Sequence, residues 1–316
     1  MSGGPGELSG KVSIVGGAGR VGSSAAYALQ LGGGCRELVL VDLAAEAAQG
    51  EALDLTHGRA AAGGPSIRAG GYDAIRGSDI VVVTAGLRRR PDESRLQLIE
   101  RNTQLFGEII RQVKAAGTAP DTILLVVTNP VDILTYLAAT DLGWPAQRTI
   151  GLGTVLDTLR FRSLLGERLG IDPAGVEALI LGEHGDSMVP VWSSLRYHGG
   201  PISAVAGCSQ EAVHEAFAAA RTAGAECLRL KGGAGYAVGL AVRQVVSAVL
   251  RDTGEVLPVC TLQQAGEFAG VALSLPTKLG RSGILGVLSP DLSEEEHKGL
   301  VHSAEVLRQT IAGLDR

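Results

Sequence analysis

Residues 11–22 read KVSIVGGAGRVG, and they carry the clearest indication of the fold. Its first five residues are mostly apolar and β-branched, which predicts a short strand. The glycines that follow permit a tight turn, and Ser23–Leu31 continues with alanine and leucine at positions typical of a helix. A strand, a glycine-rich turn and a helix are the setting in which a GxGxxG pattern holds a pyrophosphate, because the amides at the helix start point at the anion.

The glycine pattern fits in two registers. One uses Gly17, Gly19 and Gly22, and the other replaces Gly17 by Gly16. Both registers place a pyrophosphate on the first amides of the helix, so both remain open at this point. The residues of this turn that we expect at a dinucleotide cofactor are Gly16, Gly17, Gly19, Arg20, Val21 and Gly22.

An acidic residue follows the second predicted strand. The apolar run Glu37–Val41 is followed by Asp42, 20 residues after Gly22. A carboxylate at this place accepts hydrogen bonds from ribose hydroxyls and repels a 2′-phosphate, which favours NAD over NADP. Asp42 is also suited to cap a helix that begins near Leu43, and the two roles are compatible.

Three further apolar runs follow in the first half of the chain, at 66–70, 79–84 and 122–128. Continuous apolar runs are typical of parallel strands that are covered on both faces. Between the last two runs, apolar residues repeat at helical spacing from Leu96 to Val113. This alternation predicts an α/β fold with a doubly wound parallel sheet, a Rossmann domain, over residues 8–150.

The remaining residues, 151–316, predict an α+β substrate-binding and catalytic domain. A helix is expected from Gly151 to about Leu169, and a long alanine-rich helix over 211–230. Apolar runs at 256–260 and 269–273 predict strands of a small antiparallel sheet.

Two polar stretches come directly after predicted strands, at the sheet edge where such folds bind ligands. Residues 85–95 hold four arginines and a proline, which indicates either a mobile lid that carries positive charge to an anion or a solvated basic loop. The second stretch begins with Asn129, which is followed by Pro130. The Asn129 amide either hydrogen-bonds near a reacting oxygen or caps the helix expected from Val131.

Three polar side chains in the second half indicate acid–base chemistry. Asp157 and Arg160 are three residues apart and share one helical face, which by itself predicts only a weak ion pair. His184 lies in a glycine-containing loop, where a lone histidine is often structural. Together the three allow another interpretation. Asp157 orients the imidazole, His184 exchanges a proton near neutral pH, and Arg160 grips a carboxylate.

These motifs resemble those of the NAD-dependent lactate/malate dehydrogenase superfamily. They occur in the order of that family and cover about residues 11–314. The resemblance implies an oxidoreductase that acts on a small 2-hydroxy acid. Besides the glycine-rich turn, the matching motifs are Thr84–Gly86 with its arginine loop, Thr128–Asp132, Leu156–Arg162 and Gly182–Ser187.

The resemblance assigns a role to each matching polar residue. It implies that His184 accepts the proton of the 2-hydroxyl group and that Asp157 is its partner. Arg160 would bind the C1 carboxylate of the substrate. Arg95, on a mobile loop, would polarise the C2 carbonyl when the loop closes over a site that excludes water. Asn129 resembles a residue that helps to orient the substrate.

The same resemblance implies NAD as the cofactor, with its nicotinamide taking the hydride from C2. Cofactor contacts are then expected beyond the glycine-rich turn and Asp42. The additional residues are Thr84, Ala85, Gly86, Asn102, Thr128 and Asn129.

In this family, the residue two before the proline of the loop recognises the chemical group at the end of the substrate that lies away from the C1 carboxylate. Here it is Arg89, six residues before Arg95. An arginine facing a methyl group would be buried without an anion, so the resemblance implies malate dehydrogenase, which interconverts (S)-malate and oxaloacetate. Glu93–Arg95 and Pro190–Ser193 look more like lactate dehydrogenases. L-lactate dehydrogenase, or a broad 2-hydroxyacid dehydrogenase, is therefore the alternative, and a catalytically silent NAD-binding protein is a remote one.

Composition argues against several other classes of protein. A net charge of −5 provides no electrostatic attraction to nucleic acid. No apolar run is long enough to cross a membrane, and no residues show the spacing of metal ligands. The four scattered cysteines predict reduced thiols and a cytoplasmic location. The resemblance adds the expectation of a homodimer or homotetramer that binds a small 2-oxo or 2-hydroxy dicarboxylic acid.

Overall fold

The computed structural model describes residues 9–87 and 95–314, except for the side chains of residues 95 and 96. The first residues of the glycine-rich stretch form β1 (Lys11–Val15), an interior strand of a nine-stranded sheet and the third from one of its edges. Every residue of β1 is buried, because a parallel strand pairs with it on either side and helices cover both faces.

The first half of the chain alternates strands and helices, as its apolar pattern predicts. After β1 its elements are α1 (Arg20–Gln30), β2 (Glu37–Val41), α2 (Ala45–Ala62), β3 (Ser66–Ala69), β4 (Ile80–Val83), α3 (Arg95–Ala115), β5 (Ile123–Val126), α4 (Val131–Ala139) and β6 (Thr149–Gly151). The six strands are parallel and lie in the order β3-β2-β1-β4-β5-β6, which is the order of a Rossmann sheet.

The second half combines helices with antiparallel strands. Its elements are α5 (Val155–Leu169), β7 (Val176–Glu177), β8 (Ile180–Leu181), β9 (Val189–Pro190), β10 (Arg196–Tyr197), β11 (Gly200–Pro201), α6 (Gln210–Lys231), α7 (Tyr236–Leu250), β12 (Val256–Leu262), β13 (Ala272–Gly280), β14 (Gly283–Val287) and α8 (Glu294–Ala312). Two small sheets, β11-β10-β7 and β8-β9, lie apart from the main sheet.

Strands β12 and β13 pair in antiparallel fashion, as expected, but together with β14 they extend the main sheet and do not form a small sheet of their own. β12 joins the parallel part by pairing with β6 through Cys260 and Gly151. The following strand begins at Ala272 and not at residue 269. Apolar runs predict a strand but not its partner. Without β12, β6 would be an edge strand of the sheet, and β12 pairs with that edge.

Some helix boundaries also differ from the expectation. α1 begins at Arg20, three residues before Ser23, and α2 begins at Ala45 and not at Leu43. The helix expected from Gly151 begins at Val155, because Gly151 is the last residue of β6. The fold class is nevertheless confirmed, with a Rossmann-type parallel sheet followed by an α/β half that carries antiparallel strands.

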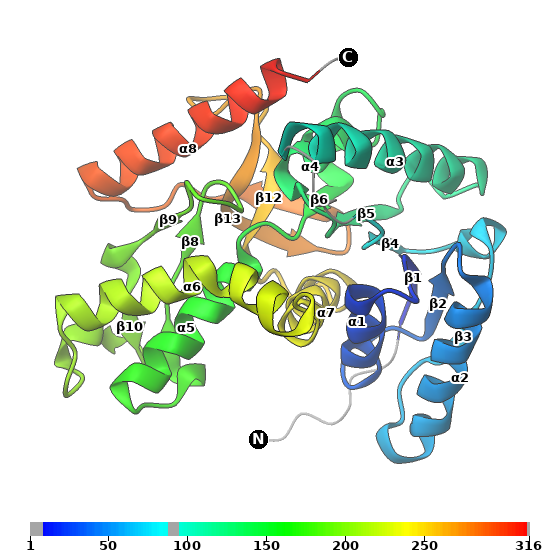
Figure 1. The fold of residues 1–316 in the computed structure, drawn as a ribbon, viewed down its shortest axis with the longest axis horizontal. Helices are drawn as coiled ribbons and strands as arrows, with labels where there is room; N and C mark the ends of the chain where they lie inside the picture. The colour runs from blue at the N-terminus through cyan, green and yellow to red at the C-terminus, as the bar shows by residue number, and fades with distance from the viewer. Residues whose placement is uncertain (1–8, 88–94, 315–316) are drawn as a thin grey trace.

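Helices cover the main sheet in two layers (Figure 1). One buried apolar cluster joins α1, α7 and the start of α5 to one face, and another joins α3, α4 and α8 to the opposite face. A third cluster lies among α5, α6 and the short strands. Within the described ranges, no helix is both long and apolar enough to span a bilayer.

Candidate active site

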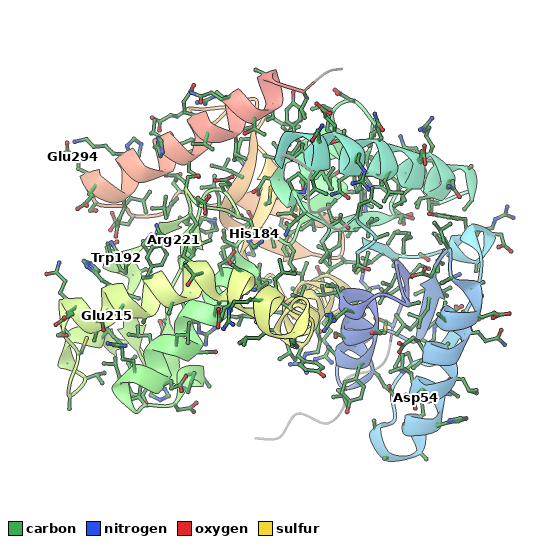
Figure 2. All side chains as sticks on the ribbon, in the orientation of Figure 1. Asp54, His184, Trp192, Glu215, Arg221 and Glu294 are labelled. Atoms are coloured by element: carbon green, nitrogen blue, oxygen red, sulfur yellow. The ribbon has the colours of Figure 1, made fainter. Side chains whose placement is uncertain are left out.

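A cavity of about 760 Å³ opens beside the carboxyl ends of the parallel strands, and residues from both halves of the chain line it. This volume lies within the range of small-molecule and cofactor sites. His184 lies near the middle of the molecule (Figure 2). The expected site residues that border the cavity are Gly16, Gly19, Arg20, Val21, Gly22, Asp42, Thr84, Ala85, Gly86, Thr128, Asn129, Arg160 and His184.

Close packing of the backbone explains the glycines of the first turn. Gly16 has a φ of +87°, and a Cβ there would lie 2.6 Å from the amide nitrogen of Ala85. A Cβ at Gly22 would lie 2.1 Å from the carbonyl oxygen of Gly16. Helix α1 begins at Arg20 without a side-chain cap, which leaves its first amides available to an anion. The turn therefore fits the pyrophosphate of a dinucleotide.

Two residues that we expected at the cofactor, Gly17 and Asn102, are not among the described residues that line the cavity. Gly17 packs on β2, where a Cβ would come within 2.9 Å of the Leu40 Cβ. Asn102 is buried, and its side chain accepts a hydrogen bond from the Leu87 amide at 2.7 Å. Gly17 thus shapes the turn and Asn102 holds the chain that follows β4. A sequence pattern does not separate contact from support, because both functions require the same residue type.

Asp42 borders the cavity at the end of β2. Its Oδ2 accepts a hydrogen bond from the Ala18 amide at 3.0 Å, and its Oδ1 accepts one from the Ala44 amide at 3.0 Å. Asp42 therefore supports the chain just before α2, as the capping alternative suggested, although Ala44 is the N-cap residue. Each carboxylate oxygen keeps a second lone pair, so a ribose hydroxyl can still be bound.

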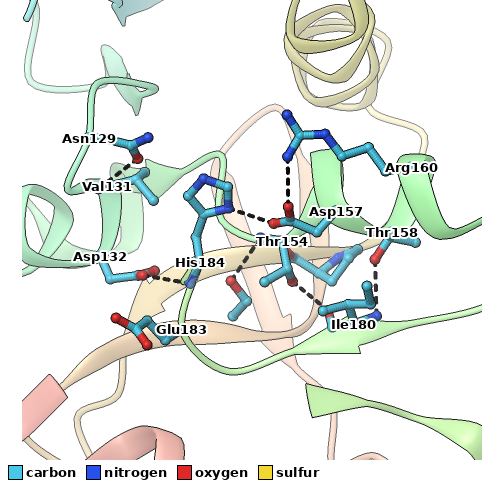
Figure 3. Close-up of polar contacts among 12 residues, drawn as sticks. Asn129, Val131, Asp132, Thr154, Asp157, Thr158, Arg160, Ile180, Glu183 and His184 are labelled. Carbon is cyan, nitrogen blue, oxygen red and sulfur yellow. Dashed lines mark hydrogen bonds and ion pairs between the residues drawn. The ribbon is translucent and has the colours of Figure 1, made fainter. Parts of the chain in front are cut away.

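Asp157 connects the two other polar residues of the second half (Figure 3). Its Oδ2 lies 2.5 Å from Nδ1 of His184, and its Oδ1 accepts a hydrogen bond from Nη1 of Arg160 at 3.1 Å. Asp157 is 1% exposed, whereas His184 and Arg160 both border the cavity. With Nδ1 held by Asp157, Nε2 is the imidazole atom that remains for proton exchange with a ligand.

The electrostatics of this group favour an imidazolium beside a carboxylate. Burial acts to raise the pKa of Asp157, but the neighbouring His184 and Arg160 outweigh it and hold that pKa below its ordinary value. Burial acts to lower the pKa of His184, but Asp157 and then Asp132 outweigh it and raise that pKa. His184 therefore binds its proton more tightly in this site than a histidine side chain does in water.

Hydrogen bonds between α5 and β8 set the position of this pair (Figure 3). Thr158 Oγ1 accepts a hydrogen bond from the Ile180 amide at 3.0 Å, and the Thr154 hydroxyl donates to the carbonyl of the same residue. The Thr154 amide donates to Ser274 Oγ on β13 at 3.0 Å. Because α5 is docked on β8, Asp157 lies beside the loop that carries His184.

Asn129 borders the cavity beyond the end of β5 (Figure 3). Its Oδ1 accepts a hydrogen bond from the Val131 amide at 3.4 Å, so the capping alternative holds in a weak form. Pro130 is the N-cap residue of α4. The nitrogen of the Asn129 amide remains suited to donate to a ligand oxygen.

Two family models match the chain along almost its whole length. The model of the lactate/malate dehydrogenase NAD-binding domain matches residues 10–151, and the model of the lactate/malate dehydrogenase α/β C-terminal domain matches residues 154–314. The chain belongs to the lactate/malate dehydrogenase family. NAD is accordingly its cofactor, and the turn around Gly16 and Gly22 has the close backbone packing that the pyrophosphate requires.

Three proteins that are similar to this chain over nearly its whole length are named L-lactate dehydrogenase. An L-lactate dehydrogenase of Synechococcus sp. (strain JA-3-3Ab) is 43% identical over 304 residues, covering 95% of this chain and 98% of the relative. An L-lactate dehydrogenase of Salinibacter ruber is also 43% identical, over 96% of this chain and 97% of the relative. The crystal structure of a minor L-lactate dehydrogenase from Enterococcus mundtii matches with a TM-score of 0.91, at 34% identity over 98% of this chain and 99% of that one.

These relatives overturn the expectation of malate dehydrogenase. That expectation depended mainly on Arg89, which lies outside the residues that the structure describes. Similarity to enzymes named L-lactate dehydrogenase extends over nearly the whole chain, and it outweighs one side chain in a loop. The side chain of Arg95, the first residue of α3, also lies outside the description, so its expected contact with the C2 carbonyl stays a prediction.

Sequence reasoning missed Asp132 as a member of the site. Its Oδ2 accepts a hydrogen bond from the backbone amide of His184 at 2.8 Å. Asp132 belongs to the motif that begins with Asn129, so the signal was present, but attention to strand ends selected Asn129 alone.

Proposed function

We propose that this enzyme is an L-lactate dehydrogenase, which interconverts pyruvate and L-lactate with NADH and NAD⁺. Reduction of pyruvate takes up one hydride at C2 and one proton at the C2 oxygen. The whole-chain similarity to L-lactate dehydrogenases supports the choice of substrate. The 2.5 Å contact between His184 and Asp157 at the cavity supports the chemistry, because it provides a proton donor of raised pKa.

His184 supplies the proton in the proposed reaction. In its protonated form it donates from Nε2 to the C2 oxygen of pyruvate, and in the reverse direction the neutral ring takes the proton from the hydroxyl of lactate. Asp157 keeps Nδ1 protonated and stabilises the imidazolium. Bound NADH supplies the hydride from its nicotinamide ring.

Arg160 binds the carboxylate of the substrate in this proposal. Its guanidinium borders the cavity and is held by Asp157 through Nη1, so its orientation is set before the substrate arrives. A guanidinium presents paired N–H donors that match the two oxygens of a carboxylate. Asn129 borders the cavity and is proposed to donate to a substrate oxygen, and Arg95 is proposed to polarise the C2 carbonyl.

A comparison of two substrates tests the proposal. Steady-state rates with NADH are measured for pyruvate and for oxaloacetate by the loss of nicotinamide absorbance. We expect the higher kcat/KM for pyruvate. A higher kcat/KM for oxaloacetate would overturn the choice of substrate, and absence of turnover with both acids would overturn the proposed chemistry.

We further propose that the enzyme assembles as a homodimer or homotetramer in the cytoplasm. Large apolar side chains are exposed on α1, α2 and α7, where Tyr27, Leu53 and Leu240 are about half exposed, and such residues are typical of surfaces that bind another chain. The four cysteines are free thiols, as expected in a reducing compartment. Light scattering coupled to size-exclusion chromatography tests the assembly, and a monomer at micromolar concentration would contradict it.

A further inference from the structure

Asp132 is a second buried carboxylate beside His184. It is the second residue of α4 and is 4% exposed. Its Oδ2 accepts a hydrogen bond from the backbone amide of His184 at 2.8 Å. In Figure 3, Asp132 approaches His184 from one side and Asp157 approaches from the other. His184 is therefore held twice, at its amide by one carboxylate and at its ring by another.

The surroundings of Asp132 do not suit a carboxylate that serves stability alone. Its Oδ1 is buried and has no hydrogen-bond partner in the described part of the chain, and the buried Cys260 thiol on β12 lies near the carboxyl group. Burial raises the pKa of Asp132 to about 6, against the opposing influence of His184 and Cys260. A buried anion with so few donors is unfavourable for folding, and such groups are enriched at functional sites.

We propose that Asp132 is a positioning residue for the reaction, which fixes the loop of His184 and, as an anion, favours the protonated imidazole. This inference rests on the proposed role of His184 as the proton donor. The charged groups facing the imidazole are Asp157 and Arg160 from α5 and Asp132 from α4. Glu183, the preceding residue, acts on Asp132. Two carboxylates oppose one guanidinium around His184, and Asp132 supplies the excess negative charge.

Three variants separate the charge of Asp132 from its hydrogen bond. Asp132→Asn removes the charge but keeps an oxygen that can accept from the His184 amide. Asp132→Leu removes both the charge and the acceptor at similar volume. Asp141→Asn is the matched control, because it removes the same charge from an exposed position just beyond the other end of α4.

Rates measured in both directions distinguish positioning from a structural defect. Loss of the nearby anion lowers the pKa of His184. In Asp132→Asn we therefore expect kcat/KM for pyruvate reduction to fall about threefold at alkaline pH. We expect kcat/KM for L-lactate oxidation at acidic pH to rise by a similar factor relative to its own maximum. A structural defect would lower both at every pH and would overturn the proposal, as would profiles that coincide with those of Asp141→Asn.

Asp132→Leu tests the hydrogen bond to the His184 amide. Without an acceptor the loop of His184 is no longer fixed, so we expect a further loss in kcat of about tenfold in both directions with an unchanged KM for NADH. A kcat equal to that of Asp132→Asn would contradict the positioning role.

Titration of His184 by NMR tests the inference without a substrate. The imidazole signal of His184 is assigned by its loss in His184→Asn and is followed against pH in the enzyme bound to NADH. We expect the midpoint to be lower in Asp132→Asn than in the parent and in Asp141→Asn. Failure to reduce pyruvate would overturn the proposed function, whereas an unchanged midpoint would overturn the role of Asp132.

Cys260→Ala provides the test if Asp132→Asn does not fold. The thiol acts to lower the pKa of Asp132, so its removal keeps the carboxyl neutral over a wider pH range. We expect the midpoint of His184 to move to lower pH, in the same direction as in Asp132→Asn. A midpoint that does not move would again overturn the proposal.

Discussion

Nδ1 of His184 lies 2.5 Å from Oδ2 of Asp157, although the two residues are 27 positions apart and come from different elements. Asp157 is carried by α5, and His184 follows β8. The same carboxylate also holds Arg160, so one buried aspartate orients both the expected proton donor and the expected carboxylate ligand. This relationship is the basis for the pH dependence and for two of the variants below.

The two directions of the reaction are expected to depend on pH in opposite ways. The pKa of His184 is raised, so the imidazole stays protonated to a higher pH than the imidazole of an ordinary histidine does. Reduction of pyruvate needs the protonated form, and its kcat/KM should be constant at lower pH and fall as pH rises through the raised pKa. Oxidation of L-lactate needs the neutral form and should rise through the same pKa. A reduction rate that increases with pH would contradict this assignment.

Asp157→Asn should impair catalysis while leaving the cofactor site intact. The amide cannot stabilise the imidazolium, so kcat/KM for pyruvate should fall about 100-fold or more. The pKa of His184 should also decrease, because Asp157 is its principal negative neighbour. Steady-state kinetics and NADH titration by fluorescence measure the two effects. An equally large loss of NADH affinity would show that the variant disturbs more than His184.

Arg160→Lys should weaken the binding of the substrate carboxylate. Lysine keeps the positive charge but loses the paired donors of the guanidinium, so kcat/KM should fall on the order of 100-fold. Arg168→Lys is the matched control, because Arg168 lies on the same helix, is 46% exposed and pairs with Glu215 at the surface. Equal kinetics for the two variants would exclude Arg160 from the substrate site.

Gly22→Ala should reduce NADH binding. The new Cβ would lie 2.1 Å from the Gly16 carbonyl oxygen, so the turn must shift and the amides of α1 with it. We expect the Kd for NADH to rise at least about tenfold and the Tm to fall. Both are measured on the purified protein by fluorescence titration and by calorimetry.

Gly50→Ala is the control for that substitution. Gly50 lies within α2, and a Cβ there has no neighbour within 4 Å. Alanine in a helix interior is favoured over glycine by about 0.5–1 kcal/mol, so the Tm should rise slightly while NADH binding stays the same. If both variants lost NADH affinity alike, the steric explanation for Gly22 would be wrong.

Much of the molecule was predictable because its signals are local. The apolar runs of the first half predicted five of the six parallel strands, all but β6, and the glycines after β1 predicted the turn that borders the cavity. The pattern failed where a residue acts through a distant partner. It did not indicate the contact of Asn102 with the Leu87 amide, and it overlooked the hydrogen bond from the His184 amide to Asp132. Substrate preference inferred from Arg89 failed for a related reason, since it depended on one side chain and not on the whole chain.

The Rossmann half, the glycine-rich turn and the group of His184, Asp157 and Arg160 could all be predicted from the amino-acid sequence. Periodicity and turn chemistry act between neighbours in the chain, so they can be read without a structure. The tertiary structure alone decided that β12 pairs with β6 and that two carboxylates meet His184 from separate helices. Those contacts join residues that are 27 to 109 positions apart in the sequence. The packing of apolar faces brings such residues together, and no local sequence pattern encodes that packing.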